Sequence, residues 1–319
     1  MTIPFPRLPW RQGAAIALLM AVGCSGNSTE PAPRTPLPLL LVVIPDLAAG
    51  PAPDLYTLNP AGDSLRRLTV TPAWELAPVW SPDGRHLAYQ MLPDSGLLTQ
   101  AEIHIMNADG SGDRRLVGPG DVGPPTWSPD GTRIAFDQAL FADSSQRALL
   151  VIRTDGTGLD TVLNRRAADG APAWSPDGTA LAFASNCLAN TPACWTTTIW
   201  TVRLADTTLR QLTFHDRLDS LGQDDAGAPQ WSPDGRLLAI QHGAQSAVAL
   251  LPANGGPWVQ VNVGSAQAWS PTWSPSGTTL AFVAGPPSAP AVWRAEGDGS
   301  QPRLLAAVPG ILRTVRWRP

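Results

Sequence analysis

The chain has 319 residues, 43% of them hydrophobic, and a formal net charge of -4 from 22 basic and 26 acidic residues. This is enough apolar material for one large domain or two small ones. No basic block occurs anywhere, and phosphate binding needs a concentrated positive patch, so the composition argues against nucleic acid as a partner. The 34 Pro and 29 Gly are spread in turn-like clusters, a distribution typical of many short strands joined by tight turns.

The first 23 residues have the features of a targeting segment. Arg7 and Arg11 precede an apolar run, residues 14–22, that is too short for a permanent membrane span. Its end, Ala-Val-Gly-Cys at 21–24, resembles the lipobox of bacterial lipoproteins, although that family usually has Leu at the first of these positions. The resemblance implies cleavage before Cys24 and lipidation of its thiol. An ordinary signal peptide with an incidental Cys is the alternative.

Residues 24–37 are polar and Pro-rich without periodicity, which predicts a flexible tether. No second long apolar segment follows, so residues 38–319 are expected to form a soluble domain that meets the membrane through the lipid anchor only. We therefore expect a monomeric protein of the bacterial cell envelope, on the periplasmic side or at the outer membrane.

A repeat dominates the rest of the chain. Trp-Ser-Pro-Asp-Gly begins at Trp80, Trp127, Trp174 and Trp231, a Ser variant begins at Trp273, and a shortened Trp-Arg-Pro begins at Trp317. In each full copy a Pro two residues before Trp predicts the start of a short strand. Ser-Pro-Asp-Gly then suits a tight turn, because Pro presets φ and Gly takes positive φ.

The segment after each turn predicts three more strands. The second strand has a small Ala between bulky residues, as in His-Leu-Ala-Tyr at 86–89, and the third includes residues 102–106 and 149–152. Turn sequences such as Asn-Ala-Asp-Gly at 107–110 then lead to a fourth strand. Four antiparallel strands at a period of about 40 to 50 residues are typical of a propeller blade.

Two ends of the chain are expected to share one blade. Residues 39–44, 54–58 and 65–69 look like strands two to four of a blade that lacks its first strand, whereas residues 315–317 look like a first strand alone. Pairing them would close the ring and remove exposed sheet edges. The prediction is an all-β, six-bladed propeller.

The motif Trp-Ser-Pro-Asp-Gly, followed by the bulky-Ala-aromatic strand and by Asn-Ala-Asp-Gly and Arg-Arg-Leu, resembles the TolB-type propeller repeat. The resemblance covers residues 38–319 and implies the fold strongly. It says less about function, because propellers of this kind occur alone, in the Tol–Pal envelope system and attached to peptidases.

Cys187 and Cys194 bracket a short loop. In an oxidising compartment a disulfide between them is expected, because two Cys without a nearby His or second Cys pair make an incomplete zinc site.

Few residues have the pattern of a catalytic or metal site. His86 and His104 stand at ordinary strand positions, whereas His215 lies in a longer connection where function could reside. Hydrolase, phosphate-loop and zincin motifs do not occur. The repeated acids Asp83, Asp130, Asp177 and Asp234 are expected to serve their turns, and Ser276 in the fifth copy agrees with that role.

A better candidate lies just before each first strand, at one mouth of the expected central channel. Its members are Glu75, Asp121, Asp169, Asp224, Asp225, Trp269 and Arg313. Such a ring would focus a negative potential and could hold a cation, for instance Ca²⁺, or a basic peptide. The alternative is that these acids are solvated residues that begin loops.

Two functions follow from these features. The favoured one is a binding module without catalytic activity or bound cofactor, whose partner is an envelope protein or peptide segment. The alternative is a calcium-dependent hydrolase of the propeller lactonase or sugar-processing kind, in which carboxylates hold the metal and the metal activates water.

Overall fold

The computed structural model describes residues 39–44 (backbone only), 53–59, 64–93, 98–140, 146–165, 167–186, 197–213, 229–242, 247–264, 266–286, 289–308 and 311–319. By the contacts among its residues the chain separates into two units, Met1–Thr35 and Pro36–Pro319. Every described residue belongs to the second unit. Cys24, Cys187, Cys194, His215, Asp224 and Asp225, with the predicted signal and tether, lie outside the described residues. Among the residues described, no helix is long and apolar enough to cross a membrane.

The described residues form antiparallel strands, with one short 3-10 turn at Leu98–Gln100. One four-stranded sheet has the order β24 (Ile311–Trp317), β1 (Leu39–Ile44), β2 (Asp54–Leu58), β3 (Leu65–Arg67). The next has the order β4 (Trp74–Trp80), β5 (His86–Leu92), β6 (Ala101–Asn107), β7 (Arg114–Gly120). A third has the order β16 (Gln230–Trp231), β17 (Leu237–His242), β18 (Ala247–Pro252), β19 (Val259–Gln260). A fourth has the order β20 (Gln267–Trp273), β21 (Thr279–Gly285), β22 (Ala291–Glu296), β23 (Arg303–Ala307).

The middle of the chain forms an eight-stranded sheet made of two sets of four. The first set is β8 (Thr126–Trp127), β9 (Arg133–Ala139), β10 (Arg147–Arg153) and β11 (Asp160–Leu163). The second is β12 (Ala168–Trp174), β13 (Ala180–Asn186), β14 (Thr197–Arg203) and β15 (Leu209–Gln211). Among the described residues the two sets pair only through the parallel contact of Arg147 with Ala168, so each set keeps the antiparallel order of the four-stranded sheets.

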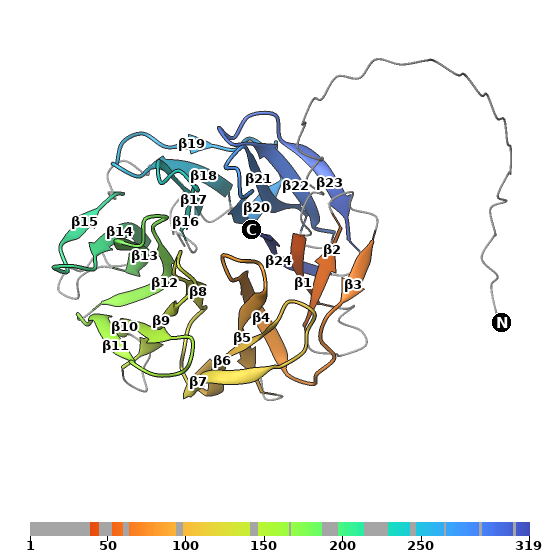
Figure 1. The fold of residues 1–319 in the computed structure, drawn as a ribbon. Helices are drawn as coiled ribbons and strands as arrows, with labels where there is room; N and C mark the ends of the chain where they lie inside the picture. The colour runs from red at the N-terminus through yellow and green to blue at the C-terminus, as the bar shows by residue number, and fades with distance from the viewer. Residues whose placement is uncertain are drawn as a thin grey trace, which may run out of the picture. The chain divides into compact units, whose positions relative to one another are not determined.

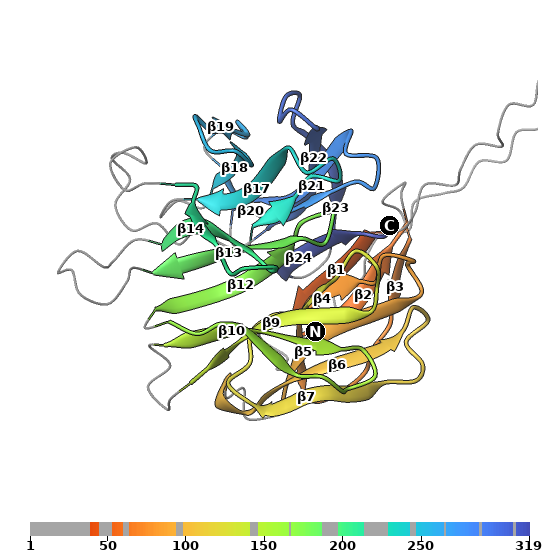
Figure 2. The same cartoon turned by 60° about the vertical axis from the view of Figure 1, so that its left-hand side comes forward.

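The strands of successive sheets are arranged in the same order from the inside outward. In Figure 1 the strands β4, β8, β12, β16, β20 and β24 face the middle of the unit, and β3, β7, β11, β15, β19 and β23 lie toward its rim. Each inner strand contacts the inner strand of the next sheet, and β24 contacts both β20 and β4. Figure 2 shows β5, β6 and β7 side by side within one such sheet.

The predicted Ser-Pro-Asp-Gly turn is confirmed in detail. Asp83 Oδ1 accepts hydrogen bonds from Ser81 Oγ (2.6 Å) and from the Arg85 amide (3.0 Å). Gly84 takes a φ of 66°, which only Gly adopts at low cost. Equivalent bonds form at Asp130, Asp177 and Asp234. The repeated acids therefore fix turns, as expected.

The Pro before Trp marks the start of the strand, as predicted, in two copies, because β8 begins directly after Pro125 and β16 directly after Pro229. In the other three full copies the Pro lies inside the strand. Strand β4 already begins at Trp74, so Pro78 lies inside it. The pairing of β4 with β5 shifts register between Leu76 and Val79, and this bulge removes the need for a ladder N–H at Pro78. Corresponding bulges surround Pro172 in β12 and Pro271 in β20, so in these copies Pro marks a bulge rather than the start of the strand.

In three copies the repeated Trp is hydrogen-bonded to the sheet before it. The Trp127 indole N–H donates to Val79 O (3.3 Å), that of Trp231 to Ala173 O (3.1 Å), and that of Trp273 to Gln230 O (3.1 Å). In each pair the acceptor directly precedes the Trp of an earlier copy. The indole N–H groups of Trp80, Trp174 and Trp317 are buried and make no hydrogen bond to any described residue, so this contact belongs to three copies of the motif and does not by itself explain the recurrence of Trp.

The small Ala of the second strand lies between neighbouring sheets. Ala88, Ala135, Ala182, Ala239 and Ala281 have no exposed surface. The bulky neighbours of these residues fill the same layers, among them the fully buried Phe136, Phe183 and Phe282. Burial on both faces of a sheet accounts for the near-continuous apolar second strands.

Strand β24 completes the sheet formed by the first strands of the domain. Leu41 pairs with Val315, and Leu39 with Trp317, in an antiparallel ladder. Leu312 and Val315 are fully buried and pack in one cluster with Leu58 and Ala281. The predicted pairing of the two chain ends in one sheet is therefore present.

Candidate functional site

Glu75 lies inside the protein and not on an open mouth. It is fully buried at the second position of β4. Thr69 Oγ1 donates to Glu75 Oε2, Thr71 Oγ1 donates to Oε1 (2.9 Å), and Thr69 Oγ1 also accepts the Leu55 amide (3.0 Å). Burial raises the pKa of Glu75 above its ordinary value, although the two threonine hydrogen bonds oppose the shift. Glu75 therefore links β4 to the β3 side of the preceding sheet.

Asp54 is a second buried carboxylate near Glu75. Its Oδ2 forms an ion pair with Arg67 Nη2 at 2.5 Å. Burial raises the pKa of Asp54 despite the charge of Arg67, and the charge of Asp54 in turn helps to raise the pKa of Glu75. No motif in the sequence marks Asp54 as a buried acid.

Asp121 belongs to a three-membered ion cluster. Arg147 Nη1 lies 2.8 Å from Asp121 Oδ1, and Arg147 Nε lies 2.5 Å from Asp137 Oδ2. The other oxygen of Asp137 accepts the Ala171 amide at 2.8 Å, which connects β9 to β12. Burial raises the pKa of Asp137 although Arg147 opposes the shift.

Glycines make room for the Asp137 carboxylate. A Cβ added to Gly123 would lie 2.2 Å from Asp137 Oδ1, and one added to Gly170 would lie 3.5 Å from the Asp137 carboxyl carbon. The Gly123 amide also donates to Asp137 O (2.7 Å). Asp137, Arg147 and the two glycines therefore form a fitted junction between the two halves of the eight-stranded sheet.

Asp169 is also fully buried and paired. Arg165 donates to both of its oxygens at 2.7 Å, and Ser185 Oγ donates to Oδ1 at 2.6 Å. The Arg165 guanidinium lies over the rings of Trp200 (4.8 Å) and Phe183 (5.4 Å). This carboxylate has two charge-assisted bonds in a fork geometry, so its charge is already compensated within the same sheet.

Trp269 and Arg313, two of the predicted site residues, lie in contact with each other. The Trp269 indole N–H donates to the Arg313 carbonyl at 3.1 Å, and the Arg313 side chain is exposed. Trp74, at the start of β4, is 43% exposed, which is unusual for so large an apolar side chain. We call Trp74, Trp269 and Arg313 the inner-strand cluster, because they come from the contacting inner strands β4, β20 and β24.

Arg316 is a cation without a carboxylate partner in the described part of the chain. Its Nη1 donates to Ser270 Oγ (2.9 Å) and Val315 O (2.8 Å). Burial lowers the pKa of Arg316 to about 10. The inner strands thus carry the hydrogen-bonded Glu75, the paired Asp169 and, in Arg316, a cation without a carboxylate partner among the described residues.

The described residues offer no metal centre of the kind a calcium-dependent hydrolase needs. No group of three or more described His, Cys, Asp or Glu side chains is placed to hold an ion. Glu75, Asp121 and Asp169 each bond to side chains nearby, and Asp224 and Asp225 lie outside the described residues. The arrangement of the described acids is suited to joining sheets.

His104 has a more specific environment than its strand position predicted. Its Nδ1 lies 3.0 Å from Asp113 Oδ2 and its Nε2 lies 3.0 Å from Glu102 Oε2, while Tyr89 Oη donates to Asp113 Oδ1 at 2.7 Å. Burial opposes charging of His104, but the two carboxylates outweigh it and raise its pKa. His86 is half-buried, with its ring centroid 6.5 Å from that of Trp127.

The sequence contained one overlooked signal for the ion cluster. Asp137 stands in a second strand whose other copies have Gln90, Ala184, Gln241 or Val283 at the same distance from Trp. A carboxylate at a position that packs between sheets needs a partner. Its partners Arg147 and Ala171 are distant in sequence, and no local pattern names them.

Known proteins resemble the chain in structure. No family model and no curated protein sequence matches it. TolB from Acinetobacter baumannii has a TM-score of 0.70 at 18% identity over 88% of this chain and 67% of that one. A putative TolB from Agrobacterium tumefaciens gives 0.63 at 18% identity over 89% and 99%. A chain of a nidogen/laminin complex gives 0.65 at 12% identity over 88% and 98%. At this identity the likeness shows the fold, a TolB-like β-propeller.

Proposed function

We propose, from the premise of a TolB-like β-propeller fold, that the chain is a closed six-bladed propeller that binds a polypeptide segment of another envelope protein. Six blades are supported by the four-stranded sets described above, when the eight-stranded sheet is counted as two. Closure is supported by the position of β24, which contacts both β20 and β4 and pairs with β1.

The observation that carries the binding function is the inner-strand cluster. Binding energy at protein interfaces concentrates in a few exposed Trp, Tyr and Arg side chains. Trp74 and Arg313 are exposed, and the Trp269 indole is fixed by its bond to the Arg313 carbonyl. The predicted site acids Glu75, Asp121 and Asp169 are hydrogen-bonded or paired within the protein, so we assign the binding role to the aromatic and cationic side chains.

The location in the envelope rests on the N-terminal sequence. We propose that residues 1–23 direct export, that Cys24 becomes the lipid-bearing residue, and that residues 24–37 tether the domain at 38–319. In the same compartment Cys187 and Cys194 would form a disulfide. Replacing Cys24 by Ser should then move the protein from the membrane to the soluble fraction of cells.

Site-specific cross-linking in intact cells tests the binding role. A photoreactive residue is placed at Arg313, at Trp74 or, as a matched control, at Leu304, which is 55% exposed on the outer strand β23. We expect one shared protein adduct from the two inner positions and none from Leu304. The same adduct from all three positions, or from none, would contradict the proposal.

A single substitution then tests how much the Arg313 side chain contributes to the free energy of binding. Arg313→Ala keeps the backbone carbonyl that accepts the Trp269 bond, so the fold should be unchanged. Loss of an interface Arg commonly costs more than about 1.4 kcal/mol, equal to tenfold in affinity. We expect at least that loss for the partner identified by cross-linking, and no loss for Arg303→Ala on β23.

A further inference from the structure

The protein places an arginine against two of its repeated Trp rings. The Arg318 guanidinium carbon lies 4.9 Å from the Trp80 ring centroid, and its Nε and Nη2 donate to Gly84 O at 3.0 and 2.7 Å. The Arg133 guanidinium carbon lies 4.7 Å from the Trp174 ring centroid. A guanidinium over an indole face gains from the ring quadrupole, so this position on the repeat accepts a planar cation.

Between these two copies lies Trp127, over whose ring no arginine of the described residues is placed. Trp127 faces His86, which occupies the sequence position of Arg133 one copy earlier. Here His86 and Trp127 line a cavity of about 490 Å³ between the β4–β7 sheet and the β8–β11 strands. A volume of this size lies in the range of small-ligand sites.

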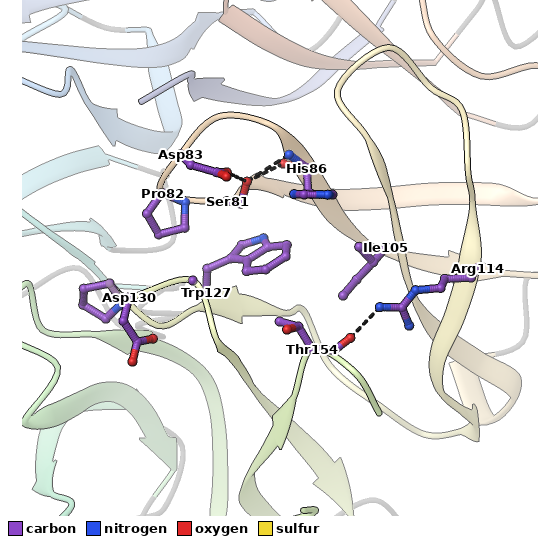
Figure 3. A pocket seen from close by; sticks show the side chains of 11 residues that line it. Ser81, Pro82, Asp83, His86, Ile105, Arg114, Trp127, Asp130 and Thr154 are labelled. Atoms are coloured by element: carbon purple, nitrogen blue, oxygen red, sulfur yellow. Dashed lines mark hydrogen bonds between the residues drawn. The ribbon is translucent and has the colours of Figure 1, made fainter. Parts of the chain in front are cut away.

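The cavity has an acidic side. Figure 3 shows Asp83 and Asp130 on one side of Trp127, and His86, Ile105 and Arg114 on the other. Both acids are exposed, and hydrogen bonds from Ser81 and Ser128 lower their pKa values. They therefore carry full negative charge at neutral pH. Gly131, the counterpart of the Gly84 that accepts from Arg318, also lines the cavity.

Arg114, which forms the positive side of the cavity, already makes one hydrogen bond within the protein. Arg114 Nη2 donates to the Thr154 carbonyl across the gap between the sheets. A cation would be repelled near Arg114 and attracted near the two acids, so its place in the cavity is fixed by charge as well as by the Trp face.

We propose that this cavity binds the guanidinium group of an arginine side chain supplied by a partner polypeptide. The guanidinium would lie on Trp127 as Arg318 lies on Trp80, with Asp83 and Asp130 compensating its charge. An acidic residue next to that arginine would meet Arg114. The cavity site does not include the inner-strand cluster, so either site can fail without the other.

The test uses the full chain and the tripeptide acetyl-Gly-Arg-Gly-amide as probe. Binding is followed by the NMR shift of the Trp127 indole N–H, assigned by its absence in Trp127→Phe. We expect saturable shifts with the Arg peptide and at least tenfold weaker binding of the same peptide with citrulline, which has the same shape without the charge. Equal binding of the two peptides would overturn the proposal.

Three variants make the test specific. His86→Arg should fill the cavity as Arg133 does over Trp174, which removes peptide binding and leaves the melting temperature unchanged or higher. Asp83→Ser with Asp130→Ser should weaken binding at least tenfold, and the turns should persist because Ser276 occupies this position in another copy. Asp177→Ser with Asp234→Ser removes the same charge away from the cavity and should leave binding unchanged. Wild-type affinity in His86→Arg, or equal losses in the two double variants, would overturn the proposal.

Discussion

Arg147 joins two carboxylates, and its removal would leave both without their cation. Asp137 is almost fully buried and Asp121 is one-fifth exposed. Breaking a buried ion pair by removing one partner costs about 3 kcal/mol or more. We expect a loss of that size in the free energy of unfolding of Arg147→Met, measured by urea denaturation.

The matched control for Arg147 is an exposed ion pair. Arg203 Nη1 lies 3.2 Å from Asp206 Oδ2, and both side chains are about half exposed. Water screens such a pair, so Arg203→Met should cost less than about 0.5 kcal/mol. Equal losses in the two variants would show that the Arg147 cluster does not hold the sheets together.

His104 should make stability depend on pH. Its folded pKa is raised by Asp113 and Glu102, so its contribution is fully present below the unfolded value of about 6.5 and is lost as pH rises through the folded value. The difference in unfolding free energy between wild type and His104→Gln should therefore be largest near pH 6 and shrink toward pH 9. A difference that stays constant with pH would contradict this assignment.

At the residue scale, turn residues were predictable and buried polar junctions were not. Asp83 and Gly84 act within a span of a few residues, so the local sequence determines their bonds. Asp137 depends on Arg147 and on the Ala171 amide. Glu75, likewise, is predicted from the sequence as a channel-mouth residue or a solvated loop residue, because its threonine partners have no distinctive spacing.

At the level of elements, the inner strands contain a recurring backbone conformation. Ala77, Ala171 and Ser270 have φ values of 47°, 51° and 54°, and each directly precedes the Pro of its bulge. This left-handed region is costly for residues with a Cβ. The same place in three strands therefore stores backbone strain.

Glycine should relieve that strain. Ala171→Gly keeps the amide that donates to Asp137 and removes the Cβ, so we expect a gain of about 0.5 to 1 kcal/mol in unfolding free energy, even after the greater flexibility of the unfolded chain. Ala180→Gly, in the regular strand β13, should instead lose about the same amount. Urea denaturation of both variants provides the comparison, and a loss at Ala171 would refute the strain argument.

Strand positions were predicted well where the repeat is regular. Residues 39–44 and 54–58 form β1 and β2 with the predicted bounds. The inner strands β4, β12 and β20 are longer than predicted, because a bulge allows a strand to continue through Pro. A Pro two residues before Trp is compatible with a strand start and with a bulge, and nothing in the local sequence distinguishes the two.

At the scale of the whole molecule, the predicted site acids that the structure describes connect strands and sheets, and this predicts that the protein does not bind calcium. Glu75, Asp121 and Asp169 are hydrogen-bonded or paired, and a calcium site needs six to eight oxygen ligands. We expect no heat of binding when Ca²⁺ is titrated into the full chain. Heat that disappears in Asp224→Ala with Asp225→Ala would contradict this expectation and return the hydrolase to consideration.

The architecture was predictable because the same motif recurs along the chain and each copy indicates the same strands and turns. The candidate functional residues do not recur in this way. The inner-strand cluster combines Trp74, Trp269 and Arg313 from three different copies, and only the last two were expected to matter. The cavity beside Trp127 lies where His86 replaces an arginine, a difference that gains meaning only once the sheets are placed against each other.

The pairing of β1 with β24 also governs the order of folding. Strand β1 leaves the ribosome long before β24, and its sheet cannot be completed until that last strand arrives. Contacts so distant in sequence slow folding, so the first sheet should stay open and accessible to chaperones while later blades are made.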